Sequence, residues 1–163
     1  HMQEPLVGWS VLADLVKREG LMNVALYSKA ARRGIREIRE KISTLGYASS
    51  TKGIRDFREE GIRAGNKKWD DLFFTIDSFS MSGFRDLFFN VQEHHFTIAQ
   101  IQEHLTALGL SFCGFELDEN VMANSKEILG SNDLYCLHNW EVVEELAPTT
   151  FMGMYQFWCQ KSS

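Results

Sequence analysis

Three short apolar segments, separated by long stretches with helical periodicity, most constrain how this chain can fold. They are Leu21–Tyr27, Leu110–Leu117 and Met152–Gln160. A short apolar run bounded by turn residues is typical of a strand, and a run without polar alternation is typical of a strand covered on both faces. Because helical segments separate the three runs, the sequence predicts an α/β fold with about three strands.

Helical periodicity fills the intervals between these runs, because apolar residues recur there at spacings of three and four. The apolar sets of the predicted helices are Trp9/Leu12/Leu15, Ile35/Ile38/Ile42, Ile54/Phe57/Ile62, Trp69/Leu72/Phe73/Ile76, Phe84/Leu87/Phe88 and Ile98/Ile101/Leu105. Two further helices are predicted over Val121–Leu129 and Leu134–Leu146. Thr97 with Gln100 matches a capping box, and Thr51 is a candidate N-cap.

The stretch between Ser28 and Phe96 contains helical patterns and no strand pattern. We therefore expect one domain over residues 1–163, in which residues 8–27 and 97–161 form the sheet. Residues 28–96 form a large helical insertion in this prediction. His1 is interpreted as a cloning remnant before a native Met2, so residues 1–2 are left out of the fold.

Charge and cysteine content narrow the classes of function. The formal net charge is -5, and acidic residues interrupt the basic cluster between Lys29 and Lys41, so the chain does not have the basic surface of a nucleic-acid binder. Cys113, Cys136 and Cys159 form no CxxC pair, which excludes a zinc knuckle and favours a reducing, cytoplasmic setting. The sequence has neither an apolar run of membrane-spanning length nor a signal peptide, and we expect no membrane partner.

Phosphate-binding and nucleophile motifs that α/β enzymes commonly use do not occur in this sequence. The glycines are scattered, and no GxGxxG, Walker or GxSxG pattern is present. We therefore expect the chain not to be a complete enzyme by itself, and we assign no cofactor-binding residue.

The densest group of polar residues lies late in the predicted insertion. It comprises Arg85 and Asp86, followed by the run from Gln92 to His95. Carboxylate and imidazole groups in one place can transfer protons, bind substrate or ligate a metal. Loop polarity between two helices is the alternative interpretation. Spacing supplies no third ligand, so no metal site is predicted.

Residues at the end of the first predicted strand are a second candidate. Tyr27 and Ser28 stand at its carboxyl end, where ligands of open α/β sheets gather. A packed tyrosine with a solvated hydroxyl is the alternative. Tyr155 and Trp158 in the last strand are interpreted as core residues, with an aromatic pocket as the other possibility.

Three sequence passages together resemble one protein family over nearly the whole chain. They are GWSVLADLVKREGLMNVALYSKAARR (Gly8–Arg33), SMSGFRDLFFNVQEHHFTIAQIQEHLTALGLSFCGFEL (Ser80–Leu117) and TFMGMYQFWCQK (Thr150–Lys161). They resemble the carboxyl half of class I S-adenosylmethionine-dependent methyltransferases, in particular a bacterial group often fused to tetratricopeptide repeats.

The resemblance implies a partial Rossmann-like methyltransferase sheet. The three predicted strands would be the last three of a seven-stranded sheet, with the final strand antiparallel and inserted between the other two. In the family, S-adenosylmethionine is held by a glycine-rich loop and an acidic residue in the amino-terminal half, and no position of this chain matches either of them. The resemblance therefore implies substrate-side residues only, which are Tyr27, Arg85, Asp86, Glu93 and His94. No catalytic residue is assigned.

Two roles remain open on this basis. The chain is either the substrate-side portion of a methyltransferase, inactive alone, or a non-catalytic module that kept the scaffold and binds a small molecule or a protein. A truncated sheet would expose the edge of Leu21–Tyr27, and exposed strand edges have to be covered or paired. We therefore expect a homodimer formed through that edge or through exchanged helical arms.

Overall fold

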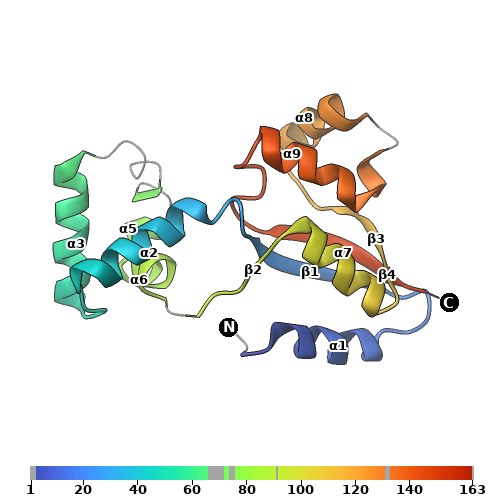
Figure 1. The fold of residues 1–163 in the computed structure, drawn as a ribbon, viewed down its shortest axis with the longest axis horizontal. Helices are drawn as coiled ribbons and strands as arrows, with labels where there is room; N and C mark the ends of the chain where they lie inside the picture. Colours follow the sequence, from blue (N-terminus) through green and yellow to red (C-terminus); the bar gives the residue numbers. More distant parts are fainter. Residues whose placement is uncertain (1–2, 66–71, 74–75, 91, 131–132, 163) are drawn as a thin grey trace. The chain divides into compact units, whose positions relative to one another are not determined.

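The computed structural model describes residues 3–65, 72–73, 76–90, 92–130 and 133–162. The chain divides into two compact units, one formed by residues 1–31 with 94–163 and the other by residues 32–93. The first unit is a sheet with helices, and the second is helical (Figure 1). The predicted α/β class is therefore confirmed.

A mixed four-stranded sheet forms the centre of the first unit. Its strands are β1 (Leu21–Ser28), β2 (His95–Phe96), β3 (Leu110–Phe115) and β4 (Tyr155–Lys161). They lie in the order β2-β1-β4-β3, and β4 is antiparallel to both β1 and β3. The expectation that the last strand is antiparallel and lies between the other two is confirmed.

β2 was not predicted, because the segment before Phe96 was expected to contain no strand. It pairs with β1 in parallel over only two positions, Tyr27 opposite His95 and Ser28 opposite Phe96. A strand this short shows no periodicity of its own. β2 covers only the carboxyl end of the β1 edge that was expected to be unpaired.

Burial along β4 alternates strictly, which corrects the prediction of a strand covered on both faces. Tyr155, Phe157 and Cys159 are buried, whereas the residues between them are exposed. Polar Gln156 and Gln160 flank Trp158 on the exposed side, so the pattern is that of a sheet with one solvated face. We call this side the open face; its exposed residues are Leu21, Asn23 and Ala25 of β1 and Gln156, Trp158 and Gln160 of β4.

Helices cover the other face of the sheet. They are α1 (Pro5–Leu15), α7 (Ile98–Ala107), α8 (Glu119–Leu129) and α9 (Trp140–Leu146) (Figure 1). The Trp9 ring of α1 meets Phe157 with 6.2 Å between ring centroids. Phe115 lies within 6 Å of the rings of Phe151, Trp140, Tyr155 and Phe157. These contacts form one hydrophobic core.

The structure confirms one predicted cap and revises another. Thr97 and Gln100 form the predicted capping box at the start of α7. At the start of the helix Thr51–Ala64, the side chain of Ser50, and not that of Thr51, accepts the hydrogen bond from the Gly53 amide, at 3.2 Å. Ser50 has the extended backbone of an N-cap, so the helix begins at Thr51 itself.

Only the second half of the helix predicted over Leu134–Leu146 is an α-helix. Its first part forms two 3-10 turns, Asp133–Tyr135 and Leu137–Asn139, before α9 begins at Trp140. The Trp140 indole donates to the Leu134 carbonyl at 2.9 Å, which holds the turns against α9. This hydrogen bond stabilises a bend that helical periodicity does not reveal.

The helical unit contains α2 (Arg33–Leu45), α3 (Thr51–Ala64), α5 (Ile76–Phe79) and α6 (Met81–Phe89). Phenylalanines dominate its core, in which Phe73 packs against Phe57, Phe84 and Phe88. Gly46 ends α2 in the left-handed conformation at φ 73°.

The helix predicted over Trp69–Ile76 lies partly outside the described residues. No helix in the described part of the chain is long and apolar enough to cross a membrane.

Gly61 offers a test of the packing in the helical unit. A Cβ atom at this position would lie 2.1 Å from Cε2 of the buried Phe73. Alanine is favoured over glycine within helices by about 1 kcal/mol, but the overlap reverses this preference. We expect Gly61→Ala to lower the free energy of unfolding by about 1–3 kcal/mol, measured by urea unfolding with hydrogen exchange of α3 amides.

Glu59→Ala, at an exposed position of the same helix, is the matched control. It should change stability by less than about 0.5 kcal/mol. A Gly61→Ala variant as stable as the wild type would contradict the close contact with Phe73.

Candidate functional site

A cluster of three polar side chains lies at the carboxyl end of β1. Ser28 is the last residue of β1, Tyr155 is the first of β4, and Glu144 belongs to α9. Pairing of Leu26 with Tyr155 brings the two strand ends together. We call these residues the Ser28–Glu144–Tyr155 cluster.

Hydrogen bonds to one carboxylate oxygen join the cluster. The Ser28 hydroxyl donates to Glu144 Oε1 at 2.6 Å, and the Tyr155 hydroxyl donates to the same oxygen. The Ser28 hydroxyl oxygen also accepts from the Ala31 amide at 3.0 Å. Ser28 and Tyr155 are fully buried, and each of their two hydroxyls has a hydrogen-bond partner inside the fold.

The surroundings of Tyr155 keep its phenol protonated. Burial raises the pKa of Tyr155 well above its usual range, and the hydrogen bond to Glu144 raises that pKa further. A phenol that donates to a carboxylate would create a second negative charge beside it on ionisation. Tyr155 is therefore a hydrogen-bond donor to Glu144 at neutral pH.

Glu144 has a second carboxylate oxygen that the cluster does not use. Both hydroxyls bond to Oε1, and Oε2 makes no hydrogen bond to the described residues. The side chain is half-buried. A carboxylate held in this way can accept a hydrogen bond from an N–H or O–H group of a ligand, or take up a proton.

Of the predicted site residues, Tyr27 and His94 belong to the same unit as this cluster. Tyr27 is half-buried and lies opposite His95 in the parallel pair of β1 and β2. Because side chains alternate along a strand, Tyr27 points to the opposite face of the sheet from Ser28. His94 directly precedes β2 and is also half-buried.

The other predicted residues belong to the helical unit. Arg85 and Asp86 are exposed on α6, and Asp86 accepts a hydrogen bond from Asn90 at 3.3 Å. The Glu93 side chain is 5% exposed; Arg39 lies 2.8 Å and Arg32 3.6 Å from its oxygens. Glu93 is thus buried against α2, whereas Arg85 and Asp86 face solvent, and the structure does not bring the three into one site.

Sequence reasoning did not single out Glu144. The signal that identifies it is helical spacing, because Trp140, Val143 and Glu144 lie on one side of α9 and the first two are buried. An acidic residue on the buried side of a helix indicates a polar partner inside the fold. Tyr155 was interpreted as core, which its burial supports, although its hydroxyl has the polar role described above.

Among the residues that the structure describes, no three His, Cys, Asp or Glu side chains lie close enough to hold a metal ion. The three cysteines are free thiols, and burial raises the pKa of Cys159 to about 11. A thiol with a raised pKa is a poor nucleophile at neutral pH.

A double-mutant cycle tests the cluster. Glu144→Ala removes the acceptor of two buried hydroxyls and should lower the free energy of unfolding by about 2–4 kcal/mol. Tyr155→Phe alone should lower it by about 1 kcal/mol, but should have no destabilising effect in the Glu144→Ala background, where the phenol lacks its partner. Equal effects of Tyr155→Phe in both backgrounds would contradict the hydrogen bond.

Alkaline pH should destabilise the fold through Tyr155. As the pH rises above 10.0, the usual tyrosine pKa, the unfolded chain loses the phenol proton while the folded chain retains it. Loss of that proton favours the unfolded state, so the free energy of unfolding should fall as pH increases. Urea unfolding between neutral pH and pH above 10.0 should show a shallower decline for Tyr155→Phe than for the wild type.

No protein-family model matches this sequence, and no curated protein sequence matches it.

Proposed function

We propose that this chain is the carboxyl-terminal, substrate-side portion of an S-adenosylmethionine-dependent methyltransferase, without the loop that binds the cofactor. The order of the strands is the main support. β1 and β3 are parallel to each other and β4 lies between them in the opposite direction. This is the arrangement that the sequence resemblance implies for the last three strands of the methyltransferase sheet.

The distribution of helices also supports this proposal. α1 and α7 cover one face of the sheet, and the open face carries the exposed residues Leu21 and Trp158. Sheets of α/β proteins usually carry helices on both faces. A portion that supplies one layer of helices would leave the other face for a missing amino-terminal portion to cover.

The Ser28–Glu144–Tyr155 cluster would serve the methyl acceptor. It lies at the carboxyl end of β1, where ligands of α/β sheets bind. Methyl transfer needs a positioned nucleophile and, when the nucleophile carries a proton, a base. In this role Glu144 would use its second oxygen to hold or deprotonate an N–H or O–H group of the acceptor.

A non-catalytic binding or oligomerising module is the second candidate function. Trp158 is 43% and Leu21 59% exposed on the open face, and β2 covers only the end of the β1 edge. Exposed apolar residues beside an unpaired strand edge are typical of a surface that another chain covers. A homodimer formed through this edge, or a protein or small molecule bound to the open face, belongs to this alternative.

Calorimetric titration with S-adenosylhomocysteine separates the two functions. Under the methyltransferase proposal the isolated chain gives no binding heat at millimolar ligand. The gene upstream of this chain then encodes a strand followed by a glycine-rich loop, and a protein extended through that region binds the ligand at micromolar strength. An upstream region without such a loop, or an extended protein that does not bind, would contradict the proposal.

Variants of the extended protein test the role of Glu144. Glu144→Gln should preserve binding of S-adenosylhomocysteine while reducing methyl transfer by about 100-fold or more. Glu145→Gln, at the exposed neighbouring position, is the matched control and should leave both properties unchanged. Unchanged transfer in Glu144→Gln would remove Glu144 from the proposed site.

A further inference from the structure

Helix α1 is apolar on two opposite sides. Trp9 and Ala13 are buried in the core of the first unit. Four large apolar residues of the helix are nevertheless exposed: Val7 56%, Val11 55%, Leu12 56% and Leu15 77%. Val7, Val11 and Leu15 lie opposite Trp9 and Ala13, and Leu12 lies to one side. We call these four residues the outer face of α1. Single exposed apolar residues are ordinary, but several on one helix form a patch that is typical of an interaction surface.

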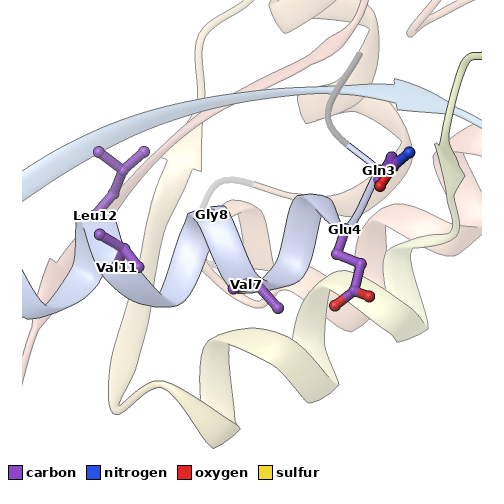
Figure 2. A pocket seen from close by; sticks show the side chains of 6 residues that line it. All are labelled: Gln3, Glu4, Val7, Gly8, Val11 and Leu12. Carbon is purple, nitrogen blue, oxygen red and sulfur yellow. The ribbon is translucent and has the colours of Figure 1, made fainter.

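The spacing on the outer face is that of a helix-packing surface. Val7, Val11 and Leu15 recur every four residues, so they form one ridge along the helix, with Leu12 beside it. Gly8 has no side chain and lets another helix approach. An open hollow of about 650 Å³ lies here, lined by Val7, Gly8, Val11 and Leu12 together with the two residues before the helix, Gln3 and Glu4 (Figure 2).

We propose that the outer face of α1 pairs with the same face of a second copy of this chain, with the two helices antiparallel. The ridge is symmetric about Val11, because Val7 and Leu15 each lie four positions from it. A two-fold axis at Val11 would place Val7 of each copy opposite Leu15 of the other. Interfaces between identical subunits are most often of this self-complementary kind.

Charges at the two ends of α1 favour a second copy in this orientation. Glu4 precedes the helix, and Lys17 and Arg18 follow it; all three are exposed. An antiparallel pair places the end of α1 that Glu4 precedes, in each copy, beside the end that Lys17 and Arg18 follow in the other copy. A parallel pair would instead bring like charges together. The antiparallel arrangement also opposes the dipoles of the two helices.

This surface is distinct from those used by the proposed function. The open face and the β1 edge are what a missing amino-terminal portion would cover, whereas the outer face of α1 is directed away from the sheet that Trp9 and Ala13 contact. The proposed function and the proposed dimerisation through α1 can therefore be contradicted independently of each other. Titration with the ligand tests the first, and the mass of the particle tests the second.

Sedimentation and light scattering of the 163-residue chain test the proposal. At micromolar concentration we expect a particle of twice the chain mass of 18.7 kDa. Val11→Glu would place two carboxylates at the two-fold axis, and this variant should be monomeric with an unchanged circular dichroism spectrum. A monomeric wild type would overturn the proposal, and so would a Val11→Glu dimer as stable as the wild type.

Charge exchange tests the antiparallel orientation without disturbing the apolar contact. Glu4→Arg and Arg18→Glu should each weaken dimerisation about tenfold, because each places like charges together twice in the dimer. The double variant restores the opposite charges and should recover the wild-type dissociation constant. Single variants without effect, or a double variant weaker than either one, would overturn the antiparallel pairing.

Discussion

Packing around Phe115 holds the first unit together. Its ring centroid lies 4.7 Å from that of Phe151, 4.9 Å from Trp140 and 5.9 Å from both Tyr155 and Phe157. Trp140 begins α9, Phe115 ends β3, Phe151 precedes β4, and Tyr155 and Phe157 belong to β4. These aromatic contacts therefore fix α9 against the sheet, which in turn places Glu144 within reach of the Tyr155 and Ser28 hydroxyls.

The helical unit depends on a different combination of interactions. Phenylalanine rings fill its centre, and a carboxylate at its end is paired with two arginines. Arg39 also donates to the Leu87 carbonyl, so that one guanidinium connects α2, the end of α6 and Glu93. Glu93 was a candidate substrate-binding residue in the sequence, whereas in the structure its carboxylate forms ion pairs within the helical unit.

Sequence periodicity predicted the elements whose signal is local. The three long strands and the helices around Ile38, Phe57 and Ile101 were recovered because each carries its own apolar pattern. β2 was missed because two residues have no pattern and the strand exists only through its pairing with Tyr27 and Ser28.

The candidate site was only partly predictable. Ser28 was recognised from its place at a strand end, but its partner Glu144 is 116 positions away in the sequence. The side chains meet only because β4, α9 and β1 come together in the fold, which spacing along the chain does not reveal. The exposed sides of β1 and β4 were missed for a different reason, because Leu21 and Trp158 are exposed although they are apolar.

The position of β4 has a consequence for how the chain reaches its fold. β4 is the last element in sequence and the central partner of β1 and β3, which make no ladder with each other. During synthesis both strands therefore emerge from the ribosome before the segment that joins them. Until that segment is available, their apolar residues are open to other chains, as is common for slow pairings between distant segments. A variant that ends before Tyr155 would lose the middle of its sheet.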